Sequence, residues 1–375
     1  MQIVKATASY EQWLRNQLRV IDSDLERKHR AMAEDLFSFL RATFYRWIQV
    51  WPEVCSVYAS APEVLAVGDL HVENFGTWRD VEGRLVWGIN DFDEACNLPY
   101  TADLIRLAVS AHLAIKGEHL RIGPKDACDA ILAGYRKGLD TGGTAFVLEE
   151  RHHWLRSMVS GVLRDPPHFW GKLDRLPTEH HCPSSALRAI EKLLPATGLS
   201  YRIVHRIAGL GSLGRERYVG IAECDGGKIA REAKALAPSA SVWTRGARAR
   251  AIWYDEIVDR AVRSVDPFVR VKGRWIVRRL APDCSRVELA SMPRARDESR
   301  LLQSMGFETA NVHLGKRKIA TSILNDLRKR PRLWLHRAAL DMAEATTRDW
   351  ERWRAHWSRG KKGVPDLQRA TEPRR

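Results

Sequence analysis

The sequence predicts an α/β (α+β) protein of two lobes, one built on a small antiparallel sheet and the other larger and mainly helical. Two observations indicate the helical parts: residues 24–49 and 286–357 place apolar side chains three and four positions apart. A third indicates the strands: short apolar runs at 64–67 and 85–89 are bounded by turn residues, and residues 201–233 alternate strand-like runs with glycine-rich turns. A chain of 375 residues is long enough for two structural units.

The remaining elements follow from the same patterns. Apolar spacing near 3.6 predicts helices at 103–115, 125–139 and 146–162. Four prolines and two adjacent histidines mark 164–183 as a linker. Beyond it we expect an antiparallel meander, with its strands at 201–208, 217–223, 228–233 and 275–280.

The composition is that of an ordinary globular chain, with 45% hydrophobic and 29% charged residues. No run approaches the roughly 18 apolar residues needed to cross a bilayer, and residues 1–14 lack a secretory signal, so we expect a cytoplasmic protein without a membrane span. The six cysteines include no CxxC pair, which argues against a zinc knuckle. A formal net charge of +15 favours an anionic partner but does not choose among nucleotides, nucleic acids and acidic surfaces.

Polar residues follow each of the first two apolar runs. GDLHVENFG at 68–76 follows one run, and NDFDE at 90–94 follows the other. Phosphoryl transfer needs a carboxylate beside the attacking hydroxyl and oxygen ligands that hold magnesium on the nucleotide, and Asp69, Asn74 and Asp91 supply that set. We therefore expect the two strand ends to converge. The alternative is that these residues only cap turns, where Asp and Asn are favoured in any protein.

The same segments contain weaker candidates for metal binding or for support of the metal ligands. Magnesium takes one or two carboxylates with phosphate oxygens and water, which suits an Asp and Asn pair better than histidine. His71 is therefore the weaker candidate ligand, and Glu73 and Asp93 are further ones.

A glycine-rich segment, GLGSLG at 209–214, lies between two of the predicted strands. Glycines let backbone amides approach phosphate, so Gly209, Gly211, Ser212 and Gly214 are candidate nucleotide contacts. A Rossmann site would need a helix after this motif. Because a strand follows instead, the arrangement is that of a kinase phosphate loop, with a plain hairpin turn as the alternative.

GDLHVENFG, WGINDFDEA and ADLIRLA together resemble the catalytic segment of aminoglycoside phosphotransferases and choline kinases. They resemble more closely the bacterial family known as domain of unknown function 2252, in which FSFLR at 37–41 also has a counterpart. The resemblance implies a protein-kinase-like fold with Asp69 as the catalytic base. It also implies that Asn74 and Asp91 bind metal and that Asp103 braces the catalytic loop.

The third strand of a kinase carries a lysine that pairs with phosphates. The matching run here is IAREAK at 229–234, in which Arg231 stands at the place of that lysine. A guanidinium can hold phosphate with two hydrogen bonds but is wider than an ammonium. Arg231 is therefore a candidate phosphate contact or an ordinary ion-pair residue, and Lys228 or Lys234 can take its place.

The acidic segments precede the glycine-rich one, the reverse of the kinase order, which a circular permutation would explain. The predicted organisation is accordingly a helical lobe with the catalytic and metal loops at 1–165, a linker and helix at 166–200, a glycine-loop β lobe at 201–284, returning helices at 285–357, and a disordered basic tail at 358–375.

The sequence thus predicts a phosphotransferase that uses ATP with Mg²⁺ or Mn²⁺ and acts on an unidentified hydroxyl-bearing acceptor. One alternative is a catalytically idle nucleotide-binding regulator, which Arg231 favours. Another, less favoured, is a basic nucleic-acid-binding protein. The kinase interpretation requires residues 209–214 to face Asp69 and Asp91 across one cleft.

Overall fold

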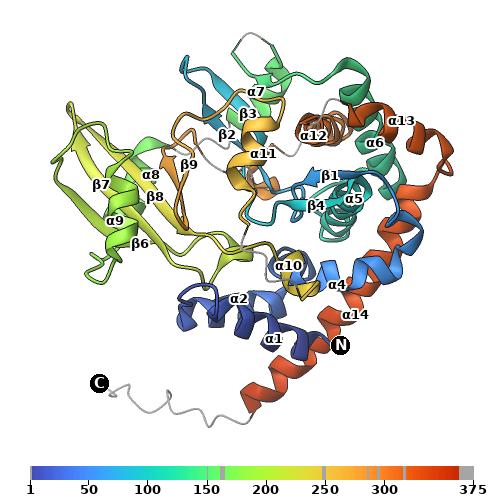
Figure 1. Ribbon diagram of the computed structural model, residues 1–375, viewed down its shortest axis with the longest axis horizontal. Coiled ribbons are helices and arrows are strands. Elements are labelled where there is room, and N and C mark those ends of the chain that lie inside the picture. Colours follow the sequence, from blue (N-terminus) through green and yellow to red (C-terminus); the bar gives the residue numbers. More distant parts are fainter. Residues whose placement is uncertain are drawn as a thin grey trace, which may run out of the picture.

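The computed structural model describes residues 2–362 except 150, 161–164, 247–250, 285, 287, 294–295 and 316–317. It shows a mixed α/β protein with small antiparallel sheets and many helices, as predicted. In Figure 1 the largest sheet lies on one side of the molecule and most of the helices on the other.

The largest sheet has five antiparallel strands and contains the predicted meander. Its order is β6 (Tyr201–His205), β7 (Arg217–Cys224), β8 (Gly227–Ala235), β10 (Trp275–Leu280) and β9 (Arg270–Lys272). The other strands form two smaller sheets, β1 (Glu63–Ala66) with β4 (Cys96–Pro99), and β2 (Phe75–Arg79), β3 (Leu85–Ile89) and β5 (Phe146–Val147) in that order.

The helices occupy most of the positions that apolar spacing indicated. Those before the five-stranded sheet are α1 (Ile3–Arg15), α2 (Asp22–Glu34), α3 (Leu36–Ala42), α4 (Phe44–Val54), α5 (Tyr100–Lys116), α6 (Pro124–Thr141), α7 (His153–Ser160), α8 (Pro166–Asp174) and α9 (Ser184–Glu191). Those within or after it are α10 (Ala240–Thr244), α11 (Tyr254–Arg260), α12 (Glu298–His313), α13 (Ile319–Lys329) and α14 (Trp334–Lys362).

Three expected elements differ from the structure. The helical pattern at 24–49 is divided into α2, α3 and α4, because the Asp35 carboxylate caps a new helix by accepting from Ser38 N at 2.8 Å. Residues 146–147 pair with β3 rather than beginning a helix. The predicted linker contains α8, because prolines in the first turn of a helix need no hydrogen bond to their nitrogen.

Helix α2 joins the glycine-rich segment to the C-terminal helix. Ile21 N, at its start, donates to Gly214 O at 2.8 Å, and Lys28 Nζ donates to Gly211 O at 3.0 Å. On its other side, Trp353 Nε1 of α14 donates to His29 O at 3.2 Å. The glycine-rich segment is therefore held from outside the sheet as well as from within it.

Helix α14 continues to Lys362 and so includes 358–362 of the segment predicted as a tail, whereas 363–375 lie outside the described residues. Within the described part of the chain, every helix is too short or too polar to cross a membrane.

Candidate functional site

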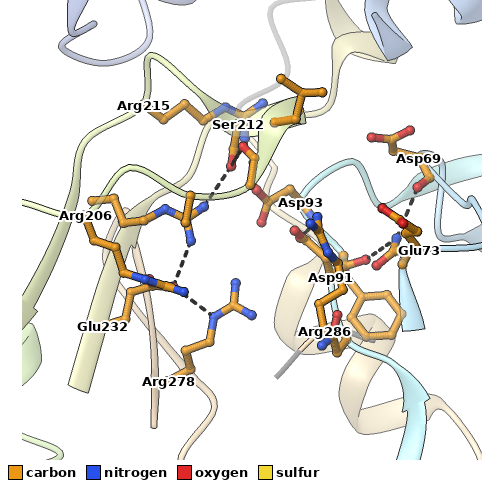
Figure 2. Close-up of a pocket in the computed structure, with 18 of the residues that line it drawn as sticks. Asp69, Glu73, Asp91, Asp93, Arg206, Ser212, Arg215, Glu232, Arg278 and Arg286 are labelled. Carbon is orange, nitrogen blue, oxygen red and sulfur yellow. Dashed lines mark hydrogen bonds and ion pairs between the residues drawn. The ribbon is translucent and has the colours of Figure 1, made fainter. Parts of the chain in front are cut away.

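Both predicted half-sites line one cavity of about 770 Å³. The acidic segments contribute Asp69, His71, Glu73, Asn74, Asp91 and Asp93, and the glycine-rich segment contributes Gly209, Gly211 and Ser212. Figure 2 shows Asp69 and Glu73 on one side, Arg206 and Glu232 on the other, and Asp91 and Asp93 between them. The expected meeting of the two segments across one cleft is therefore found.

Asn74 links the two acidic segments. Its Nδ2 donates to the backbone carbonyls of Asp69 and Asp91, each at 3.1 Å. The strands β1 and β3 that precede these segments lie in different sheets, so the segments meet through this amide and not through strand pairing. The Oδ1 of Asn74 is buried and has no hydrogen-bond partner among the described residues.

Asp69 is held by a buried arginine that the sequence analysis did not single out. Both Nε, at 2.8 Å, and Nη2 of Arg106 donate to Asp69 Oδ1. Burial raises the pKa of Asp69 above its ordinary value even though Arg106 opposes this. Arg106 follows Asp103 by three residues on α5, and this spacing, which places the two on one helix face, was the available signal.

The glycine-rich segment approaches Asp69 closely. A Cβ atom added to Gly211 would lie 3.0 Å from Arg41 O and 3.4 Å from Asp69 Oδ2. Gly209 also lines the cavity, whereas Gly214 packs against Leu25 of α2 and is not among the lining residues. The tip of the segment thus lies over the carboxylate oxygen that Arg106 leaves free.

Lys234, on β8, pairs with the carboxylates of the second acidic segment. Its Nζ lies 2.6 Å from Asp93 Oδ2 and 3.3 Å from both carboxylate oxygens of Asp91. Burial alone would raise the pKa of Asp91, but Lys234 and Arg278 outweigh it and hold that pKa well below its ordinary value. For Asp93, burial and the adjacent Asp91 charge raise the pKa.

Arg231 does not join this group. Its guanidinium donates to the carbonyls of Leu193 at 2.8 Å and Ala230 at 3.0 Å, and it lies 4.4 Å from the centre of the Phe268 ring. Successive side chains of a strand point to opposite faces, so Arg231 and Lys234, three residues apart, face opposite sides of the sheet.

Asp103 braces the loop that carries Asp69. Its two carboxylate oxygens accept from Val67 N at 2.7 Å and Gly68 N at 2.9 Å. His313 Nε2, at the end of α12, lies 3.0 Å from the same carboxylate, and Tyr135 Oη lies 2.7 Å from His313 Nδ1. All three side chains are buried.

His71 and Glu73 face arginine rather than Lys234. Glu73 Oε2 lies 2.6 Å from Arg41 Nη1, and Glu73 Oε1 accepts from Leu289 N at 3.3 Å. The backbone N–H of Glu73 donates to His71 Nδ1 at 3.2 Å. Burial, with Arg41 next in importance, lowers the pKa of His71 well below its ordinary value.

A cluster of arginines surrounds a single buried carboxylate on the sheet. Glu232, 1% exposed, pairs with Arg206, with Arg217 at 2.9 Å and with Arg278 at 3.3 Å. Arg217 Nη2 also donates to Ser212 Oγ of the glycine-rich segment at 2.8 Å. This cluster was not predicted from the sequence, because Arg206 lies just after β6 and the other members lie on β7, β8 and β10, so no local spacing links them.

The donor atoms suit a small, oxygen-preferring cation. The described residues contain no group of three or more His, Cys, Asp or Glu side chains able to hold a metal ion. The candidate metal ligands are instead the carboxylate oxygens of Asp91 and two buried oxygens, Asn74 Oδ1 and Asp93 Oδ1. These two have no hydrogen-bond partner in the described chain. An amide with one or two carboxylates is a set that magnesium accepts when phosphate and water complete it.

Comparison with known proteins finds a bacterial family whose model is similar to the part of the chain that contains the acidic segments. Residues 19–160 match the model of the family described as an uncharacterized protein conserved in bacteria (DUF2252). The matched part includes the segments with Asp69, Asn74, Asp91 and Asp103 and ends before the glycine-rich segment. No curated protein and no solved structure matches the chain.

Proposed function

We propose that this protein transfers the γ-phosphoryl group of a magnesium-bound nucleoside triphosphate, ATP in the simplest case, to a hydroxyl of a second molecule. The acceptor oxygen bonds to the γ-phosphorus, and the bond between that phosphorus and the β–γ bridging oxygen breaks. The nucleoside diphosphate leaves, and the hydroxyl proton moves to the Asp69 carboxylate. The two-lobed, circularly permuted kinase-like fold expected from the sequence is part of the same proposal.

The observation that carries the proposal is the position of Asn74. Its amide nitrogen fixes the backbones of Asp69 and Asp91, and its buried oxygen has no partner in the described chain. In protein kinases an Asn after the catalytic Asp and an Asp at the end of the next segment hold the metal ions. Asn74 and Asp91 would hold magnesium here, which would neutralise charge on the phosphates.

Two further contacts support the same roles. Lys234 lies on the third strand of the sheet and pairs with Asp91. A lysine that binds phosphates from this strand is expected to lie near the metal ligand. Gly211 lies beside Asp69, so phosphates under the glycine-rich segment would come close to the proposed base. Of the three candidates that the sequence offers for the phosphate contact, Arg231, Lys228 and Lys234, we therefore propose Lys234.

Nucleotide binding is the first test. Calorimetry with ATP and Mg²⁺, repeated with Mn²⁺ and without metal, should show metal-dependent binding, and Asn74→Ala should weaken it. Arg231→Gln is the matched control and should bind like the parent, because Arg231 contacts Leu193 and Phe268 instead. Equal binding with and without divalent metal would contradict the metal assignment.

Turnover separates the proposal from its alternatives. Incubation with labelled ATP and a pool of cell metabolites and proteins should yield a labelled acceptor. Metal-dependent binding without any labelled product or phosphate release would support an idle regulator. Salt-dependent oligonucleotide binding that survives Asp91→Asn, without nucleotide binding, would support the nucleic-acid alternative.

A further inference from the structure

Two arginines that the proposed reaction leaves unused line the same cavity as Asp69. Arg41 lies on α3, in the FSFLR segment, and Arg286 lies in the segment after β10. Each is held by one carboxylate, Arg41 by Glu73 at 2.6 Å and Arg286 by Glu288 at 3.0 Å. Figure 2 shows Arg286 on the side of Asp91 that faces away from Ser212.

Both arginines have an unused donor. The Nε atoms of Arg41 and Arg286 are buried and find no hydrogen-bond partner in the described part of the chain. The side chains themselves are 12% and 30% exposed, so they are not simply solvated. A buried N–H without an acceptor is unfavourable, so each arginine keeps a donor available to an added acceptor.

The positive charges of Arg41 and Arg286 also repel one another. Burial is the main cause that lowers the pKa of Arg41, and the charge of Arg286 is the next. Like charges drawn together inside a protein are stabilised when an anion binds between them. Arginine suits this role because its planar fork matches phosphate and carboxylate geometry.

His71 offers a third donor at the same place. Its Nδ1 accepts the backbone N–H of Glu73, so the proton of the neutral imidazole lies on Nε2. His71 lines the cavity together with Arg41 and Arg286. Three donor groups from three separate segments thus line the same cavity as the proposed base.

We infer that the acceptor carries a phosphate group of its own, which Arg41 and Arg286 bind while its hydroxyl lies at Asp69. This inference rests on the proposed function. It distinguishes the protein from kinases of cationic acceptors such as choline, whose ammonium group needs aromatic rings or carboxylates. The site described here presents guanidinium groups, and their two carboxylates are already paired.

The test uses inorganic phosphate as the probe and choline as the opposite charge. The full chain is first saturated with magnesium and a non-hydrolysable ATP analogue. The nucleotide site is then occupied, so that added phosphate can bind only at the proposed acceptor site. Calorimetry then compares the parent, Arg286→Gln, and the double variant Arg41→Gln with Glu73→Gln, which leaves no unpaired charge. Arg30→Gln, an exposed arginine paired with Glu26 on α2, is the matched control.

We expect phosphate to bind the parent and the control, and to bind both site variants at least about tenfold more weakly, as loss of a charge-assisted hydrogen bond predicts. Choline should not bind. Unchanged phosphate affinity in both site variants, or binding of choline in place of phosphate, would overturn the inference. If the double variant fails to fold by circular dichroism, Arg286→Gln decides, since its side chain is the more exposed.

The same titrations separate this inference from the proposed function. If the analogue fails to bind but phosphate binds in an arginine-dependent way, the nucleotide proposal fails and the anion site stands. If the analogue binds normally and phosphate affinity ignores both arginines, the anion site fails alone.

Discussion

Asp103 and His313 are joined by a contact of 3.0 Å across 210 residues of sequence. The contact fixes α12 to the loop that carries Asp69, because the same carboxylate accepts the backbone N–H groups of Val67 and Gly68. The geometry of the proposed base therefore depends on a helix from the far end of the chain.

Removing this carboxylate should destabilise the whole protein. Asp103→Ala leaves two buried N–H groups and one imidazole without their acceptor, and we expect the free energy of unfolding to fall by about 3 kcal/mol or more. Tyr135→Phe removes only the outer member of the chain and should cost about 1 to 2 kcal/mol. Urea unfolding of both variants checks the order; equal losses would show that Asp103 has no special role.

Gly68 cannot carry a side chain in this loop. Its φ is +82°, and an added Cβ would lie 2.3 Å from Glu94 O. Gly142 has a similar φ of +77° but open space around it, so Gly142→Ala isolates the backbone cost, about 1 kcal/mol. We expect Gly68→Ala to lower the free energy of unfolding by clearly more than this and to displace Asp69. Matching unfolding curves for the two variants would refute the steric argument.

The two proposed roles of Asp69 and Asp91 can be separated. Asp91→Asn removes a charge facing the metal and should weaken magnesium-dependent ATP binding together with turnover. The fold should survive, because Asp93 still pairs with Lys234 at 2.6 Å. Calorimetry measures the affinity, and phosphate release measures turnover while the acceptor is unknown.

Asp69→Asn should behave differently. It retains oxygen and shape but loses the base, so ATP affinity should change little while turnover falls on the order of a hundredfold or more. If this variant turns over like the parent, the base lies elsewhere.

Glu308 makes stability depend on pH. Burial raises the pKa of its carboxyl from 4.5 to about 7, although Arg263 and hydrogen bonds from Asn311 and Ile89 oppose this. The folded state therefore keeps this proton after the unfolded state has lost it. The contribution of Glu308 is fully present below pH ~4.5 and is lost as pH rises through ~7, a change on the order of a few kcal/mol.

Glu308→Gln removes the titrating group, so the parent and this variant are compared at each pH. We expect the difference in unfolding free energy between parent and variant to change steadily between pH 5 and 8, in the direction that favours the parent at low pH. A difference that does not vary with pH would mean that Glu308 is ionised in the folded protein.

The parts of the site that follow from local motifs were predictable. Asp69, Asn74 and Asp91 lie close to strand ends and the glycine-rich turn lies between strands, so their meeting was predicted, although the Asn74 amide and not strand pairing joins the two acidic segments. The pairing of Lys234, rather than Arg231, with Asp91 was not predictable, because it depends on which face of β8 turns toward the acidic segments, and strand pairing decides that. The arginines around Glu232 could not be predicted either, because a net charge of +15 does not show where any one arginine lies in the fold.

The pairing of Lys234 with Asp91 and Asp93 has a consequence for biosynthesis. As the chain is made, the two carboxylates emerge some 140 residues before the amine that compensates them, and Asp103 emerges 210 residues before His313. These contacts cannot form until most of the polypeptide has been synthesised. Folding that relies on contacts between residues far apart in the sequence is slow. The contacts that brace the loop of Asp69 can therefore form only after α12 has been synthesised.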